Sequence, residues 1–158
     1  VQVVLDQMAA MGAPPIHTLD PVEVREANRG MQPPVPGAMM ANEEDRAIPG
    51  PAGDIPIRVY RPTEASNHPL LVWFHGGGWV LGDLDQDDVS CRELASRAGA
   101  VVVSVDYRLA PETRLEDLLT DIHDAYAWIR DNGPRFFGAD PNRVALIGHS
   151  AGGYLALE

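Results

Sequence analysis

The sequence predicts an α/β fold with a mostly parallel sheet, because apolar runs alternate with amphipathic helical patterns along its central part. Apolar runs at 70–75, 100–105 and 143–148 predict three strands. The stretches 88–98 and 115–131 lie between them and place apolar residues at helical spacing. This order gives two strand–helix–strand units, whose crossovers we expect to be right-handed.

Each predicted helix has an apolar stripe that indicates its buried face. In the helix over 88–98 the stripe includes Cys91, so this cysteine is expected in the core rather than as a nucleophile, and Gly99 predicts the helix end. The second helix is expected to carry its acidic residues on the opposite face and to end at 133–134, where glycine precedes proline. Its stripe comprises Leu115, Leu118, Leu119, Ile122, Tyr126 and Ile129.

The N-terminal part has a different pattern. Residues 1–30 contain two short helical patterns, and the second begins near Pro21, at a first-turn position that favours proline. A proline-rich connector follows at 31–37. Residues 55–60 alternate between apolar and polar side chains, as in a strand, and Pro56 within them favours an edge position in the sheet.

Composition excludes several classes of function. The formal net charge of −11 and the isoelectric point near 4.7 disfavour binding to nucleic acid or to an anionic membrane. The single cysteine excludes an internal disulfide, fits a reducing compartment and leaves no Cys/His cluster for a metal. Because no apolar run approaches 18 residues and no signal peptide is visible, we expect a soluble cytoplasmic protein without a membrane span.

Residues 148–152, with the sequence Gly-His-Ser-Ala-Gly, match the pattern Gly-x-Ser-x-Gly of a nucleophile elbow. In such an elbow a strand turns sharply into a helix, and the serine at the bend is exposed at the end of the sheet. Ser150 is therefore the predicted nucleophile. A motif this short also fits a plain glycine-rich turn, so a second motif is needed to decide.

The second motif is His75 followed by three glycines, directly after the predicted strand at 70–75. Acyl transfer creates an oxyanion that needs fixed backbone N–H donors, and a glycine run lets the backbone approach the reacting carbon closely. The predicted donors are the amides of Gly77, Gly78 and Ala151. No Gly-Lys-Ser/Thr follows and the spacing Gly-x-Gly-x-x-Gly is absent, so a phosphate-binding loop is not predicted.

A third motif, Asp-Tyr-Arg-Leu-Ala-Pro-Glu at 106–112, follows the strand at 100–105. With these three motifs the chain resembles the hormone-sensitive-lipase-like bacterial carboxylesterases, also called family IV. The resemblance implies an α/β-hydrolase fold, with a mostly parallel sheet flanked by helices and an N-terminal helical cap. It also implies a division into a cap segment and connector at 1–42 and the N-terminal part of the hydrolase core at 43–158.

The same resemblance assigns roles to individual residues. It implies that Ser150 is the catalytic nucleophile and that His75 shapes the glycine loop. It implies that the charged residues of 106–112 anchor a loop and do not touch substrate. The oxyanion hole implied by the resemblance comprises Gly76, Gly77, Gly78 and Ala151. No cofactor and no metal are implied.

Three departures from the family pattern, at His149, at 113–116 where the proline-rich continuation of family IV is lacking, and after Ser150, leave alternatives open. His149 stands where the family usually has aspartate, and Gly-His-Ser also occurs in kynurenine-formamidase-like amidases, which are the alternative enzyme class. We expect His149 to pack beneath the turn. In this fold the triad acid and histidine follow the serine, but residues 151–158 contain no histidine and a single acid, Glu158.

The expected function is carboxylic-ester hydrolysis through an acyl-serine intermediate, with a small ester as substrate. Because the triad acid and histidine are missing here, and strand 143–148 would form an exposed apolar sheet edge, we expect the 158 residues to be part of a larger hydrolase. The remaining C-terminal part of that hydrolase is then the main partner, and a homodimer stays open. If the chain ended at 158, an inactive scaffold that binds a small ligand would be the alternative.

Overall fold

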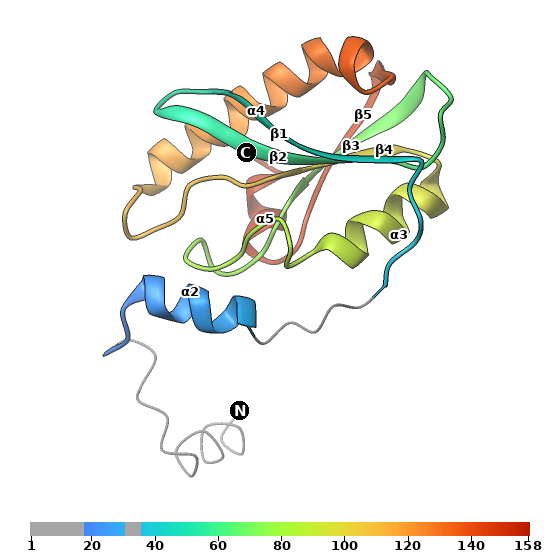
Figure 1. Cartoon of the computed structure of the whole chain (residues 1–158). Helices are drawn as coiled ribbons and strands as arrows, with labels where there is room; N and C mark the ends of the chain where they lie inside the picture. Colours follow the sequence, from blue (N-terminus) through green and yellow to red (C-terminus); the bar gives the residue numbers. More distant parts are fainter. Residues whose placement is uncertain (1–17, 31–35) are drawn as a thin grey trace.

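The computed structural model describes residues 18–30 and 36–158, which form a five-stranded sheet with helices on both faces (Figure 1). The strands lie in the order β1-β2-β4-β3-β5. They are β1 (Asn42–Gly50), β2 (Gly53–Arg61), β3 (His68–Phe74), β4 (Val101–Val105) and β5 (Ala139–Gly148). The helices are α2 (Pro21–Gly30), α3 (Asp88–Ala98), α4 (Leu115–Phe136) and α5 (Ala151–Leu155). The predicted α/β fold is confirmed, whereas the first of the two N-terminal helical patterns lies outside the described residues.

The two predicted strand–helix–strand units are present. Strand β3 pairs in parallel with β4 on one side and with β5 on the other. Strands β1 and β2 extend the sheet in antiparallel fashion, so the described sheet is mixed. A two-residue turn at 51–52 joins β1 to β2, and such a short connection can only join antiparallel strands.

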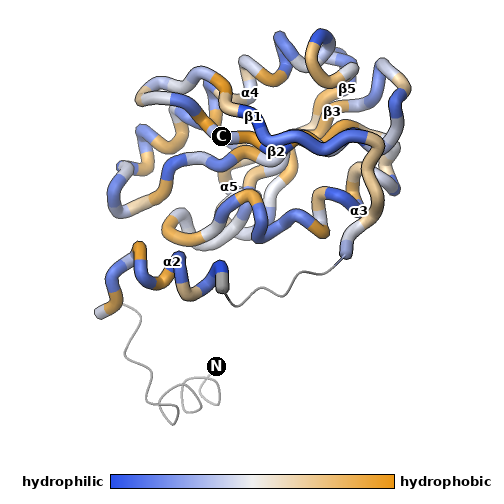
Figure 2. Tube along the Cα trace, in the orientation of Figure 1, coloured by the Kyte–Doolittle hydropathy of each residue, from blue (hydrophilic) through white to orange (hydrophobic). Residues whose placement is uncertain are grey.

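The core lies on both faces of the central strands. Helix α4 covers one face and α3 covers the other (Figure 1), and Leu155 of α5 belongs to the same core cluster as the α4 residues. Every residue of β4 is buried, including Ser104, as expected for a largely apolar strand covered on both sides. Figure 2 shows this concentration of apolar residues in the sheet, between helices that are polar on their outer sides. The stripe residues Leu118, Ile122 and Ile129 of α4 are buried in that core.

Helix α4 is longer than predicted, because it continues through 133–134 to Phe136. Proline lacks an amide hydrogen, so Pro134 deprives the helix of one hydrogen bond without ending it. Gly133 is buried there, and its carbonyl accepts a hydrogen bond from the amide of Phe137 at 2.8 Å.

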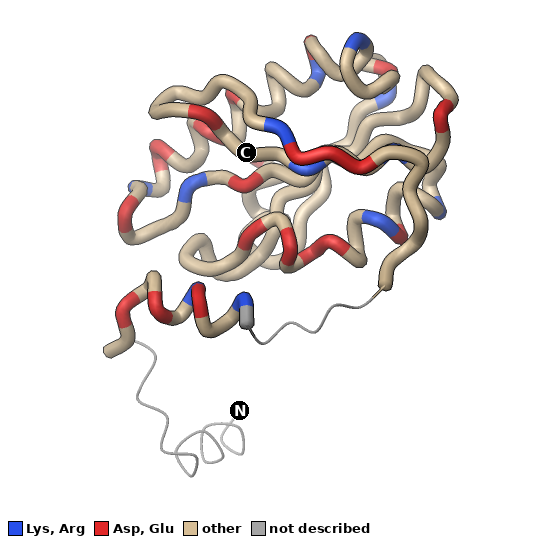
Figure 3. Tube along the Cα trace, in the orientation of Figure 1, with Lys and Arg blue, Asp and Glu red and all other residues tan. Residues whose placement is uncertain are grey.

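The prediction that Pro56 marks an edge strand is wrong. Strand β2 lies between β1 and β4, and β1, for which the sequence predicts no strand, forms the edge. The carbonyl of Pro56 accepts a hydrogen bond from the amide of Asp106, one residue beyond the paired part of β4. The proline nitrogen faces that same end of the ladder, where no N–H is needed. The acidic residues along β1, visible in Figure 3, explain why no apolar pattern predicted this strand.

Strand β5 pairs with β3 along one edge. Along its other edge it has no partner strand within the described parts of the chain. Ala145 and Leu146 are exposed there, although the apolar sequence of this strand is typical of one covered on all sides.

Among the helices of residues 18–30 and 36–158, none combines the length and the apolar character that crossing a membrane requires.

An acidic residue lies on the buried face of α4, where the stripe pattern predicted only apolar side chains. Asp121 is fully buried and accepts hydrogen bonds from Nε and Nη2 of Arg108 at 2.7 and 2.6 Å. The backbone amide of Arg108 donates a third hydrogen bond at 3.1 Å. This bidentate pair fixes the segment after β4 on the first half of α4.

Replacing Arg108 tests the importance of this pair. Arg108→Ala leaves the carboxylate of Asp121 buried without its counter-charge, so we expect a loss of about 3 kcal/mol in the free energy of unfolding. Urea unfolding of the whole protein measures this loss. Arg114→Ala, at an exposed arginine, is the control and should leave the unfolding midpoint unchanged. Equal midpoints for both variants would contradict the assignment.

Candidate active site

The two glycine motifs meet at one end of the sheet. Strands β3 and β5 are parallel, and Phe74 lies opposite Gly148 at the last pairing position of each. The chain leaves β3 into the loop that begins at His75 and leaves β5 into the turn at Ser150. The amide of His149 donates a hydrogen bond to the carbonyl of Phe74 at 3.3 Å, which joins the two exits directly.

The turn at Ser150 has the strained geometry of a nucleophile elbow. Ser150 has φ 53° and ψ −114°, a conformation that residues other than glycine rarely adopt. It is exposed, and α5 starts at the next residue. A Cβ at Gly148 would overlap the backbone of Gly152, and a Cβ at Gly152 would overlap the carbonyl oxygen of Phe74. Both glycines are therefore required by close backbone approach.

The glycine loop packs against this elbow. A Cβ on Gly76 would lie 2.9 Å from the carbonyl oxygen of His149 and 3.0 Å from its Nδ1 atom, so this contact needs glycine. Gly77 and Gly78 both have positive φ values, 112° and 63°. Within the described residues, the amides of Gly77, Gly78 and Ala151 donate no hydrogen bond to the protein. Free amides of this kind are what an oxyanion site requires.

His75 is fully buried beneath the loop. Its ring stacks on Tyr107 with centroids 4.2 Å apart, and the Tyr107 hydroxyl donates a hydrogen bond to the carbonyl of His75 at 2.6 Å. Its Nδ1 atom lies 2.8 Å from the carbonyl oxygen of Gly76. That oxygen can only accept, so Nδ1 carries the proton. These contacts are those of a residue that shapes the loop.

Asp106 is the acidic group nearest to His75, with Oδ1 3.8 Å from Nε2. Burial raises the pKa of the Asp106 carboxyl above its usual range, and the nearby carboxylates of Asp83 and Asp85 act in the same direction. The attraction of His75 and Arg29 opposes this shift without cancelling it.

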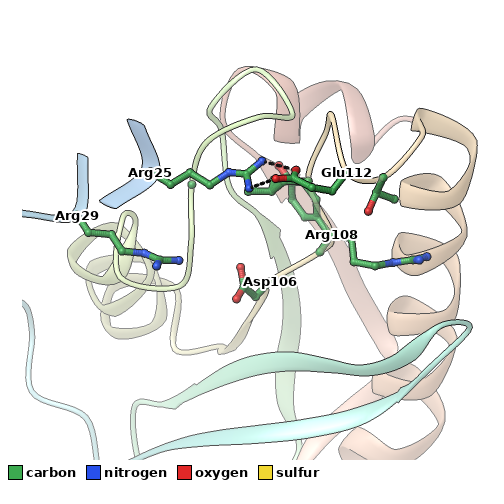
Figure 4. A pocket seen from close by; sticks show the side chains of 9 residues that line it. Arg25, Arg29, Asp106, Arg108 and Glu112 are labelled. Atoms are coloured by element: carbon green, nitrogen blue, oxygen red, sulfur yellow. Dashed lines mark hydrogen bonds and ion pairs between the residues drawn. The ribbon is translucent and has the colours of Figure 1, made fainter. Parts of the chain in front are cut away.

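Asp106 also lines a pocket of about 410 Å³ between α2 and the segment 106–113 (Figure 4). Three arginines line the same pocket, and each is paired with an acidic residue: Arg25 with Glu112, Arg29 with Asp83 and Arg108 with Asp121. Arg108 and Glu112 thus make anchoring contacts, in keeping with the role that the sequence predicts for the charged residues of 106–112.

Within residues 18–30 and 36–158, no histidine ring forms a hydrogen bond with Ser150. His149 is exposed, so the prediction that it packs beneath the turn is wrong: glycine at position 76 leaves no side chain there to cover it. His68 lies at the start of β3, where its ring nitrogens contact Thr63 and the carbonyl of Gly99. His123 is exposed on α4. His17 lies outside the described residues.

Cys91 is fully buried in α3 against Tyr60, Ala95 and Val102, as predicted. Burial raises the pKa of its thiol, which keeps it protonated and unreactive. In the described part of the chain, no three His, Cys, Asp or Glu side chains come together in a way that could hold a metal ion.

Gly152→Ala tests the close approach at the elbow. The added methyl group must displace the carbonyl of Phe74, so we expect a loss of about 2–3 kcal/mol in the free energy of unfolding. Gly153→Ala is the control, because a Cβ there meets only the carbonyl of Gly148 at 3.3 Å. Thermal unfolding measures the loss of stability in both variants. A destabilisation of equal size in Gly152→Ala and Gly153→Ala would contradict this account.

The raised pKa of Asp106 predicts a pH-dependent stability. A carboxyl whose pKa is higher in the folded than in the unfolded state stabilises most at low pH, and this contribution is lost as pH rises through the folded pKa. Asp106→Asn removes the ionisation, so its stability relative to the parent should increase from pH 4 to pH 7. Unfolding midpoints at both pH values measure the difference, and a constant or shrinking difference would refute the prediction.

Comparison with known proteins shows the family to which the chain belongs. The α/β-hydrolase fold family matches residues 71–158. The carboxylic ester hydrolase LipN of Mycobacterium tuberculosis (strain ATCC 25618 / H37Rv) is 45% identical over 138 residues, which cover 87% of this chain and 37% of that protein. Esterase LipI of the same organism is 48% identical over 115 residues, covering 71% and 36%.

Among solved structures, the ester-hydrolase EH1AB1 from the metagenome of Lake Arreo superposes with a TM-score of 0.85 at 37% identity. The match covers 97% of this chain and 50% of that one. The chain thus spans between about a third and a half of the length of these relatives. Their names do not support the kynurenine-formamidase-like alternative. The resemblance to the family IV carboxylesterases is confirmed, and the chain belongs to the α/β-hydrolase fold family.

Proposed function

We propose that the whole protein is a carboxylic-ester hydrolase that acts through an acyl-serine intermediate. The observation that carries this proposal is the strained, exposed Ser150 at the end of β5, beside a glycine loop with unbonded amides. The relatives named as esterases support the same reaction class.

In the proposed reaction, Ser150 Oγ attacks the ester carbonyl carbon and loses its proton to a histidine base. The amides of Gly77, Gly78 and Ala151 stabilise the negative charge on the carbonyl oxygen. Collapse of the intermediate expels the alcohol, which takes up the proton, and leaves an acyl-serine. Water, deprotonated by the same histidine, then attacks the acyl carbon; the acyl–Oγ bond breaks, the histidine returns the proton to Ser150 Oγ, and the acid is released.

The histidine and the acid of the triad follow the serine in α/β-hydrolases, and residues 151–158 contain no histidine. We propose that both come from the part of the whole protein that follows Ser150 in sequence. Small esters with short or medium acyl chains are the proposed substrates, from the family resemblance. A cytoplasmic location, supported by the single cysteine, is part of this proposal, and a homodimer is the assembly to examine first.

The alternative is an inert scaffold that binds a small ligand, favoured by the lack of a histidine base near Ser150 in the described residues. An activated serine reacts with a fluorophosphonate, whereas an unassisted serine is a weak nucleophile. We expect the whole protein to be labelled at Ser150 and to hydrolyse p-nitrophenyl acetate.

Ser150→Ala should abolish labelling and lower kcat by about 10⁴-fold or more. Cys91→Ala is the matched control, because this buried thiol is remote from the reaction and should leave the labelling unchanged. A folded whole protein that is neither labelled nor active would refute the hydrolase and favour the scaffold.

A further inference from the structure

One arginine connects the N-terminal helix to the glycine loop. Arg25 of α2 donates hydrogen bonds from Nε to the carbonyl of Val80 and from Nη2 to the carbonyl of Ala110, both at 2.7 Å. Its guanidinium also pairs with both carboxylate oxygens of Glu112, at 2.9 and 2.8 Å, as the dashed lines in Figure 4 show. The side chain is only 16% exposed.

The two carbonyls belong to segments that already contact each other. Val80 and Leu81 donate hydrogen bonds to the carbonyl of Gly77, which closes the turn of the glycine loop. The amide of Ala110 donates a hydrogen bond to the carbonyl of Trp79 at 2.8 Å. Arg25 therefore bonds to one carbonyl in each of the two joined segments, that of Val80 and that of Ala110. Val80 lies only three residues after Gly77.

The glycine loop needs a restraint of this kind. Glycines have more backbone freedom than other residues, and an oxyanion site works only when its donors are fixed before the charge develops. Arg25 supplies a planar donor group that reaches the two carbonyls and Glu112 at once. Lysine could pair with Glu112 but could not reproduce the planar fork.

Among the described residues, few other contacts fix helix α2 to the rest of the molecule. Over residues 21–29 no side chain is fully buried, so apolar packing contributes little. In Figure 1 the helix lies apart from the sheet, on the side of the loop after β3. The second ion pair of α2, between Arg29 and Asp83, involves an arginine that is 60% exposed.

We propose, on the basis of the hydrolase function above, that Arg25 is a positioning residue for the oxyanion loop. By bonding to Val80 and Ala110 together, it makes the docking of α2 and the ordering of the Gly77 and Gly78 amides a single event. Displacement of α2 then lowers the rate of the chemical step, although no residue of this helix needs to touch the reacting atoms.

Hydrogen–deuterium exchange of the whole protein tests the restraint itself and needs no activity. In Arg25→Met the amides of Val80 and Leu81 should exchange about 10-fold faster, because the turn that protects them loses its external contact. Exchange in β3 and β4 should stay unchanged. Arg29→Met is the matched control, since it removes an ion pair of the same helix without touching the loop carbonyls, and it should leave loop exchange as in the parent.

Steady-state kinetics with p-nitrophenyl acetate test the catalytic consequence. An oxyanion site acts on the transition state, so Arg25→Met should lower kcat about 10- to 100-fold and change KM less than threefold. Arg25→Lys should resemble Arg25→Met. Glu112→Gln, which keeps both carbonyl contacts, should change kcat less than threefold, as should Arg29→Met.

The outcomes separate this inference from the proposed function. Unchanged loop exchange in Arg25→Met, equal acceleration in Arg29→Met, or faster exchange with unchanged kcat would each overturn it. If the parent hydrolyses no ester, the proposed function fails, and exchange still decides whether Arg25 orders the loop. If Arg25→Met does not fold, Arg25→Lys takes its place as the variant that loses the planar donor group. Glu112→Gln then serves as the control that keeps both carbonyl contacts.

Discussion

The parallel pairing of β3 with β5 is the constraint on which the rest of the site depends. It brings Phe74 and Gly148 to the same sheet end, so that two sharp changes of chain direction occur side by side. Neither could be accommodated with ordinary residues, because the backbone of Gly152 contacts the carbonyl of Phe74 and that of Gly76 contacts His149. The site is built from main-chain contacts, and the sheet register sets their positions. Side chains such as His75 and Tyr107 then fill the space beneath them.

Arginine makes close approach possible in a strongly acidic chain. The sequence has 23 acidic residues and no lysine, so all 12 basic residues are arginines. Arg58 contacts both Asp45 and Asp85, and Arg92 contacts both Glu43 and Asp88. Each guanidinium thereby lets two acidic segments lie near each other without net repulsion. The same property, a planar group with several donors, lets Arg25 serve two carbonyls and one carboxylate at once.

Local patterns in the sequence predicted the elements that are buried in the sheet. Strand β4 and helix α3 agree with their predicted ranges to within one residue, since their apolar residues all serve one core. Strand β1 could not be predicted, because most of its side chains are charged or exposed and only Ile48 is fully buried, so no alternating apolar pattern marks it. The contacts of Arg25 could not be predicted from the sequence either. They join residues 55 to 87 positions apart, and periodicity carries no information at that distance.

The contact between Gly76 and His149 has a consequence for protein engineering. A Cβ atom at position 76 would lie 2.9 Å from the carbonyl oxygen of His149. A larger side chain at this position would therefore displace the peptide that leads into Ser150. A library meant to change which molecules the protein accepts should therefore leave this glycine alone. The rings of Trp79 and Tyr154, which meet edge to face with centroids 5.9 Å apart, join the same two segments through side chains.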